Sequence, residues 1–272
     1  MKKILVAVDF SEASRNASEY AAELAKLYDA NLILLHAFYL PFPVGDAPGY
    51  IPLSLAEIQE ENNAFLQREI EYLVQQYHIK VEGDVKMGMA AAIIKDTAEE
   101  INADLVILGM KGSGSSPGIF GSTVITSIRK TKQPLLIIPV NAKFNLIKHI
   151  SFATDFESKG GDDRYRLMEE MILKFNAELQ IIHVQKGDAD MSAQEVAGKI
   201  ATEQRFSKWQ HNFYTVANDN VEKGINDFIA IHPTDMLVMV AHHHSLYQRW
   251  FGDIHTNLMA YHAHLPLLVL HD

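Results

Sequence analysis

The sequence predicts an α/β protein built from two tandem, doubly wound parallel sheets. Short, continuous apolar runs alternate with segments of helical periodicity, which is typical of strands buried on both faces of a parallel sheet and covered by helices. This pattern restarts after Pro139, so the 272-residue chain contains it twice. The alternation predicts the fold class, and the restart predicts two copies of it.

The first copy begins with an apolar run at residues 4–8 that ends in Asp9. A helix is expected next, with Ser11 or Ser14 as its N-cap. Four prolines and two glycines in residues 38–52 then predict a long loop, either a functional lid or a solvent-covering loop. Further strands are expected at residues 31–37, 81–87, 105–108 and 135–140, and further helices at residues 55–77 and 90–101.

Four segments of the first copy recur in the same order in the second. The matching pairs are residues 3–10 and 149–156, 31–37 and 178–184, 104–108 and 235–239, and 133–137 and 265–269. We therefore predict two domains, residues 1–142 and 146–272. They are expected to pair through their last strands, residues 135–140 and 267–270, as an intramolecular pseudo-dimer able to form a homodimer. Two domains on a loose linker are the alternative.

Composition narrows the choice of partners and compartment. A net charge of −10 disfavours binding to nucleic acid, because phosphate backbones are bound by clusters of lysine and arginine. The apolar runs fall short of the ~20 residues that cross a membrane. Only five apolar residues follow Lys3 before Asp9, so no secretory signal is expected. These features predict a cytoplasmic protein that binds neither nucleic acid nor membrane, and the absence of cysteine excludes disulfides.

Residues 104–139 carry the sharpest functional signal. An apolar run meets Gly109 and a loop rich in glycine and serine before Pro117, and the pair Gly121-Ser122 then opens an apparent helix. Glycines let a backbone approach a ligand closely, and free N–H groups at a helix start attract anions. A phosphate cradle is predicted here, and an ordinary flexible turn is the alternative.

Together these residues resemble the universal stress protein family as a tandem pair. The ATP-binding branch of that family carries Gly-x2-Gly, about nine residues, and then Gly followed by Ser or Thr. Here Gly109, Gly112 and Gly121-Ser122 match with a spacer of eight residues, and Asp9 matches the aspartate that ends the first strand. The resemblance implies five-stranded, Rossmann-like sheets of the type found in adenine nucleotide α hydrolases.

The resemblance also implies a ligand and its contacts. The ligand would be ATP or a related adenine nucleotide, with or without Mg²⁺. Asp9 and the backbone at Ala37 and Leu108 would hold adenine and ribose. The residues around the phosphates would be Gly109, Gly112, Gly121, Ser122, Thr123 and Val124. Ligands of open parallel sheets bind beyond the carboxyl ends of the strands where the strand order reverses, which agrees with this placement.

The second copy departs from this motif. Val-Ala-His-His at residues 240–243 replaces Gly-x2-Gly, and Gly-Asp-Ile at residues 252–254 replaces Gly-Ser-Thr. Side chains occupy the path of the backbone, and the carboxylate of Asp253 repels phosphate. The second copy is therefore expected not to bind ATP in the same way.

Histidines are concentrated in the second copy, with eleven of the thirteen from His149 onward. Neutral imidazoles bind zinc, and a His-x-His pair can present both rings on one side of an extended segment. The candidate ligands are His242, His244, His262 and His264. Neither cysteine nor a defined ligand spacing accompanies them, so no metal site is assigned.

Enzyme motifs are missing from the sequence. It contains no Gly-x4-Gly-Lys-[ST] loop, and no Gly-x-Gly-x-x-Gly follows the first strand. The leading hypothesis is therefore a nucleotide-dependent sensor or switch for an unknown protein partner. A ligand-free interaction module and a weak ATP hydrolase are the alternatives. Bulky substitutions at Gly109 or Gly121 are expected to abolish nucleotide binding and to leave the fold largely intact.

Overall fold

The computed structural model describes residues 1–39, 54–110, 121–156, 162–185, 191–241 and 265–271. We call residues 1–140 the first half and residues 147–271 the second half. The strands of the first half are β1 (Lys3–Val8), β2 (Asn31–Phe38), β3 (Val81–Met87), β4 (Leu105–Met110) and β5 (Leu135–Pro139). Those of the second half are β6 (His149–Ala153), β7 (Glu178–Gln185), β8 (His211–Ala217), β9 (Met236–Ala241) and β10 (Leu267–His271).

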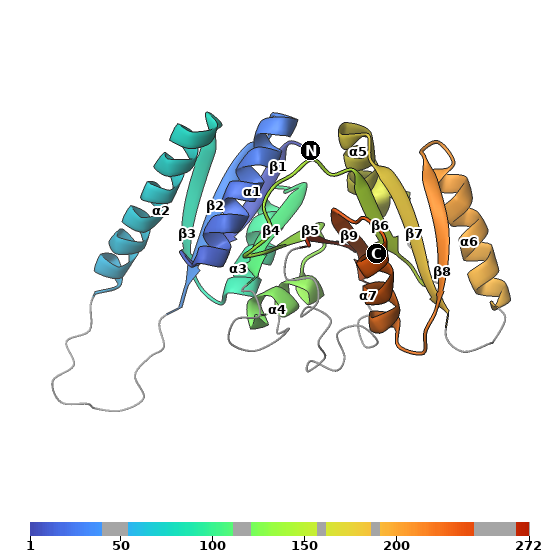
Figure 1. The fold of residues 1–272 in the computed structure, drawn as a ribbon. Coiled ribbons are helices and arrows are strands. Elements are labelled where there is room, and N and C mark those ends of the chain that lie inside the picture. Colours follow the sequence, from blue (N-terminus) through green and yellow to red (C-terminus); the bar gives the residue numbers. More distant parts are fainter. Residues whose placement is uncertain (40–53, 111–120, 157–161, 186–190, 242–264, 272) are drawn as a thin grey trace, which may run out of the picture.

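These strands form one ten-stranded sheet with the order β3-β2-β1-β4-β5-β10-β9-β6-β7-β8. All neighbours within each half are parallel. At the junction of the halves β5 and β10 pair antiparallel, with Leu136 opposite Leu268. The two tandem parallel five-stranded sheets that the sequence predicted are thus present and are joined edge to edge (Figure 1). The joining strands are the two that were expected to pair.

Helices cover both faces of this sheet, as a doubly wound fold requires. The helices are α1 (Glu12–Tyr28), α2 (Leu55–Tyr77), α3 (Ala90–Glu100), α4 (Ser122–Lys130), α5 (Arg166–Phe175), α6 (Ala193–Phe206) and α7 (Val221–Ile231), with a 3₁₀ turn η1 (Asp162–Tyr165) before α5. Along β1, Ile4 and Val6 pack into the core that also contains residues of α1, α2, α5 and α6, whereas Leu5 packs into the core of α3, α4 and α7. This alternation explains why the strands are continuous apolar runs.

The end of β4, next to the glycine-rich stretch, differs from the sequence prediction. The predicted strand 105–108 continues as β4 through Gly109 and Met110, so the expectation that the loop begins at Gly109 is wrong. Gly109 lies opposite Ile138 in the ladder, and Val140 N donates to Met110 O (2.9 Å). Pairing with β5 extends the strand across a residue of low strand propensity.

In the part of the chain that the structure describes, no helix is long and apolar enough to span a membrane.

The segment that joins the two halves is fastened to α1 by Asn16, which is 6% exposed. Asn16 Nδ2 donates to Pro139 O (3.0 Å) and to Ala142 O (2.8 Å), and its Oδ1 accepts from Lys143 Nζ (3.0 Å). Phe144 then packs edge-on against Tyr20, with ring centroids 5.0 Å apart. One amide side chain therefore satisfies two main-chain carbonyls just where the chain leaves the first half.

We expect Asn16→Ala to lower the free energy of unfolding by about 1–3 kcal/mol, because two hydrogen bonds are lost in a buried site and Ala142 O loses its donor, whereas Pro139 O keeps the one from Ala142 N. Urea denaturation followed by circular dichroism measures this change. The matched control is Asn63→Ala on the exposed side of α2, which should change stability by less than about 0.5 kcal/mol. Equal effects of the two substitutions would contradict a fastening role for Asn16.

Candidate functional site

The candidate site lies where the carboxyl ends of β1 and β4 meet. The chain passes from β1 to β2 and β3 on one side and then crosses to β4 on the other, so the strand order reverses between β1 and β4. Ala7 pairs with Leu108 across this point. Asp9 follows β1 directly, and Gly109 lies near the end of β4. The structure thus brings two of the predicted site residues to one edge of the sheet, at the position where open α/β sheets bind ligands.

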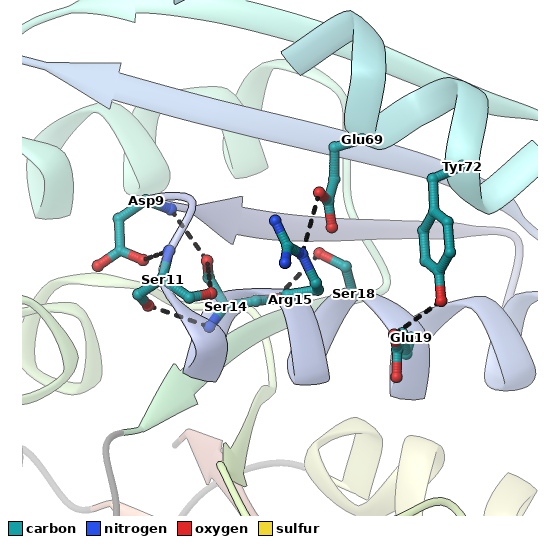
Figure 2. A network of polar contacts seen from close by, with 8 residues as sticks. All are labelled: Asp9, Ser11, Ser14, Arg15, Ser18, Glu19, Glu69 and Tyr72. Carbon is teal, nitrogen blue, oxygen red and sulfur yellow. Dashed lines mark hydrogen bonds and ion pairs between the residues drawn. The ribbon is translucent and has the colours of Figure 1, made fainter. Parts of the chain in front are cut away.

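Asp9 is exposed at the head of α1 and is held there by main-chain groups. Its Oδ1 accepts from Ser11 N (3.0 Å), and its own N–H donates to Ser14 Oγ (3.3 Å). Ser11 is the N-cap of α1, because its side chain accepts from Ser14 N (3.3 Å). Figure 2 shows this network at the start of the helix. The carboxylate therefore has a fixed place beside a helix N-terminus, where negative charge is favoured.

The turn between Asp9 and α1 depends on Phe10, whose φ of 60° lies in the left-handed region that costs a bulky residue about 1 kcal/mol or more. Its ring packs against His36 of β2, with centroids 4.4 Å apart, and against Phe65 of α2 at 5.5 Å. His36 Nδ1 lies 2.8 Å from Val8 O and must donate, since a carbonyl only accepts. Aromatic packing thus offsets the backbone strain of the turn that directly follows Asp9.

The second half repeats this arrangement. Phe156 also has a φ of 60°, and its ring stacks on His183 at 4.7 Å. His183 Nδ1 lies 3.1 Å from Thr154 O. The Asp-Phe pair and the histidine of the second strand both recur in the sequence. The repeat therefore contained a sign of this packing, but no role was predicted for either aromatic ring. Its presence in both halves indicates a requirement of the fold.

Helix α2 braces α1 through polar side chains that Figure 2 also shows. Arg15 Nε lies 3.5 Å from Glu69 Oε2, and Tyr72 Oη donates to Glu19 Oε1 (3.0 Å). The hydrogen bond to Glu19 raises the pKa of the Tyr72 phenol, which therefore stays a donor at neutral pH. The helix that carries Ser11 and Ser14 at its start is held in place from the α2 side.

Gly109 has a packing role that its sequence position did not reveal. A Cβ added there would lie against the carbonyl group of Ala13 and 2.8 Å from Ser14 N, closer than Cβ atoms approach other atoms. The glycine lets α1 approach β4 closely. The expectation that a bulky residue at Gly109 leaves the fold largely intact is therefore wrong, because the first turn of α1 would have to move.

Gly121 differs, because none of the described residues has an atom within 4 Å of a Cβ added there. Its φ of −57° and ψ of 147° suit any residue, and it is the N-cap of α4. No side chain of the described residues caps this end, so the N–H groups of Ser122, Thr123 and Val124 have no acceptor within the helix. Val124 is buried in the core and Ser122 is exposed. The start of α4 therefore presents three N–H groups and two hydroxyls.

The remaining predicted residues are placed as follows. Ala37 is half-buried near the end of β2, opposite Lys86, and Leu108 is 3% exposed within β4. Both side chains belong to the sheet, so only their main chains are suited to face a ligand. Gly112 lies outside the described residues. In Figure 1, α4 lies at the lower end of the central strands, the end toward which β2 runs.

The metal candidates His242, His244, His262 and His264 all lie outside the described residues. Within the described ranges there is no group of three or more His, Cys, Asp and Glu side chains that could hold a metal ion. Asp155, which corresponds to Asp9, is half-buried after β6.

Residues 1–139, just over half of the 272-residue chain, match the family described as the universal stress protein family. The chain belongs to this family. The universal stress protein Sll1654 of Synechocystis is 30% identical over 142 residues, which cover 51% of this chain and 85% of the relative. Universal stress protein MJ0531 of Methanocaldococcus jannaschii is 26% identical over 139 residues, which cover 50% and 81%.

A solved structure has the same overall size as this universal stress protein. The crystal structure of a universal stress protein from Archaeoglobus fulgidus covers 98% of this chain and 97% of its own, with a TM-score of 0.77 and 20% sequence identity. At this identity the similarity shows a shared fold, and it extends over both halves.

The two glycines should respond differently to the same small change. We expect Gly109→Ala to lower the free energy of unfolding by about 1–3 kcal/mol, because the added methyl group overpacks the contact between β4 and α1. Gly121→Ala should lower it by less than about 1 kcal/mol, because only the preference for glycine over alanine at the N-cap of α4 is lost. Chemical denaturation of both variants tests this, and a Gly109→Ala protein as stable as the wild type would show that the close approach is not required.

Proposed function

We propose that the first half of this universal stress protein binds ATP or a related adenine nucleotide, and that it acts as a sensor or switch in a stress response. The observation that carries the proposal is the start of α4, where no described side chain caps the N–H groups that follow Gly121 and no described residue lies within 4 Å of a Cβ added to this glycine. Helix N-termini of this kind bind phosphate through N–H groups and the helix dipole. The second supporting feature is Asp9, exposed and fixed at the point where the strand order reverses.

The proposed contacts follow from the chemistry of each group. The Asp9 carboxylate accepts hydrogen bonds from ribose hydroxyls, and the main chain at Ala37 and Leu108 recognises adenine. The N–H groups and hydroxyls at the start of α4 bind the phosphates, with Gly112 completing the cradle. A Mg²⁺ ion would neutralise part of the phosphate charge. Gly109 contributes indirectly, because it holds the head of α1 against β4.

The switch we propose is a shift of populations. A nucleotide that touches both the turn at Asp9 and the start of α4 favours conformations in which these two elements have one relative position. A protein partner that binds those conformations better then distinguishes the nucleotide-bound protein from the free protein. The strength of the switch equals the difference in nucleotide affinity between the two conformations.

We further propose that residues 1–142 and 146–272 are two domains of a cytoplasmic protein, of which only the first binds nucleotide. Pairing of β5 with β10 supports an intramolecular pseudo-dimer, because each strand covers what would be an open edge of the other sheet. In this arrangement the second domain stabilises the first and offers surface to a partner.

The nucleotide site is tested at Gly121, where an added Cβ meets none of the residues that the structure describes. Gly121→Val places branched carbons over the N–H groups of α4, so we expect the affinity for ATP to fall at least about tenfold, as when charge-assisted hydrogen bonds are lost. Isothermal titration calorimetry measures the affinity, and circular dichroism checks that the fold is unchanged.

The matched control is Gly252→Val, the position that corresponds to Gly121 in the sequence of the second half. It should leave ATP binding as in the wild type. Native mass spectrometry of freshly purified wild-type protein provides a second test, because a nucleotide that co-purifies with the protein increases the measured mass. A wild-type protein that neither co-purifies with nor binds adenine nucleotide would instead favour the ligand-free interaction module.

A further inference from the structure

The outer edge of β8 offers a surface on which another molecule can bind. β8 is the last strand of the ten-stranded sheet, and among the described strands it pairs with β7 alone. We propose that β8 pairs antiparallel with β8 of a second copy of this chain, so that two molecules join their sheets edge to edge. The candidate nucleotide site lies between β1 and β4 in the other half of the sheet, so this association does not depend on nucleotide binding.

The main chain of β8 presents a row of hydrogen-bonding groups on this edge. On the inner side of the strand, Gln210 O accepts from Leu179 N (3.1 Å), and Asn218 N donates to Gln185 O (3.0 Å). Main-chain groups of successive residues point to opposite sides of a strand, so the even-numbered residues face β7 and the odd-numbered ones face outward. No described strand pairs with the outward groups, whose row is a template for another strand. The outward residues are His211, Phe213, Thr215 and Ala217.

β8 lacks the charges with which edge strands avoid such pairing. Its sequence, His-Asn-Phe-Tyr-Thr-Val-Ala, contains no Asp, Glu, Lys or Arg. The strand at the other end of the sheet, β3, carries Glu82, Asp84 and Lys86. Charged side chains on an edge strand discourage pairing with another chain. The composition of the two edges therefore favours association through β8 over association through β3.

Helix α6, which runs alongside β8, adds an exposed apolar stripe to this end of the molecule (Figure 1). Lys199 Nζ of this helix lies 5.7 Å from the centroid of the Phe213 ring, which places α6 over the strand. Phe206 is the only buried residue of α6, a helix that the structure describes throughout. Apolar residues at the spacing of one helix face normally pack against a core, whereas those of α6 are exposed. This stripe consists of Ala193, Val196, Ala197, Ile200 and Ala201.

Charge and area indicate that the partner is a second copy. Because the chain has a net charge of −10, two copies repel each other least where neither presents charge, and the β8 edge and the α6 stripe are such a place. At the other end of the sheet, α2 exposes Glu60, Glu61 and Glu71. A specific interface buries about 800 Å² on each partner, more than one short strand edge supplies, so the α6 stripe supplies the remaining area.

One register of the two strands uses every outward main-chain group. It places Tyr214 opposite the partner's Tyr214, Phe213 opposite the partner's Thr215, and His211 opposite the partner's Ala217. The last two pairs each exchange both N–H to C=O hydrogen bonds, as alternate pairs of an antiparallel ladder do. The two-fold axis of this pairing is perpendicular to the sheet, so both copies of α6 lie on one face, where their stripes can meet. The junction of β5 with β10 shows the same antiparallel joining of two sheets within the chain.

Sedimentation equilibrium of the full chain, without nucleotide, tests the proposal. We expect the wild type to form a dimer in equilibrium with the monomer. Thr215→Pro removes an N–H group that faces outward and none that pairs with β7, so the fold should be retained, which circular dichroism checks. The dissociation constant of the dimer should rise about 100-fold, or about tenfold for the hydrogen bond lost from each of the two copies.

The matched control is Met87→Pro in β3, the edge strand at the other end of the sheet. Gly88 N donates to Phe38 O of β2, so the even-numbered residues face β2 and the N–H group of Met87 faces outward. This substitution should leave the dissociation constant unchanged, whereas Ile200→Lys, which adds a charge to the α6 stripe, should raise it. A monomeric wild type, equal effects of Thr215→Pro and Met87→Pro, or unchanged dissociation constants in both Thr215→Pro and Ile200→Lys would overturn the proposal.

The register is tested with a single introduced cysteine, because the chain contains none. In the proposed pairing the two copies of Tyr214 lie opposite each other at a position without mutual hydrogen bonds, where Cα atoms are about 4.5 Å apart and a disulfide can form. Diamide, which takes up the two electrons and two protons of the thiols, should therefore link Tyr214→Cys chains into a covalent dimer. Thr215→Cys is the control, since its two copies lie diagonally, about 7–8 Å apart, and should link far less. Equal linkage in the two variants, or none in Tyr214→Cys, would contradict the pairing of β8 with β8.

Discussion

The antiparallel pairing of β5 with β10 is the interaction on which the rest of the architecture depends. Parallel sheets need cover on both faces and leave two open edges, and each half closes one of its edges against the other. Leu136 and Leu268, opposite each other at this junction, are fully buried. The outer edges that remain are β3 and β8, and β3 carries Glu82, Asp84 and Lys86, charges that discourage further pairing. One ladder therefore fixes how the two halves, and the linker between them, lie relative to each other.

Most of the fold was predictable from the sequence because buried parallel strands and amphipathic helices leave local patterns. The helix at residues 55–77 and the strand at residues 81–87 were predicted with the bounds that the structure has. The end of β4 was predicted less well. Gly109 follows an apolar run, as the first residue of a loop often does, but its ladder partner Ile138 is far away in the sequence, and no local pattern contains that contact. Asn16 escaped notice for the same reason, since its acceptors lie in the linker.

The repeat separates what the fold requires from what the site requires. The strained turns at Phe10 and Phe156, each packed on a histidine, occur in both halves, so they cannot explain a function confined to one of them. Gly109 also has a packing task, the close approach of α1 to β4, although the second half has Val240 at the corresponding position. Gly121 has no such task in the described structure, but the second half keeps this glycine as Gly252, so the difference between the halves lies in the next residue, Ser122 in the first half and Asp253 in the second. The sequence alone ranked the two glycines equally, because the space beside each Cβ position is a property of the tertiary structure.

Helix α4 brings these separate observations together. Its first turn offers N–H groups to the proposed nucleotide, and its last turn accepts a hydrogen bond from His271 at the end of β10. A helix of nine residues is about 13 Å long, so the two ends are close enough to move as one rigid body. Nucleotide binding at the first turn and the contact with the second half at the last turn then favour or disfavour the same displacement of α4, and such coupling is reciprocal. The second half would then act on a nucleotide site in the first half through the end of one helix, without binding nucleotide itself.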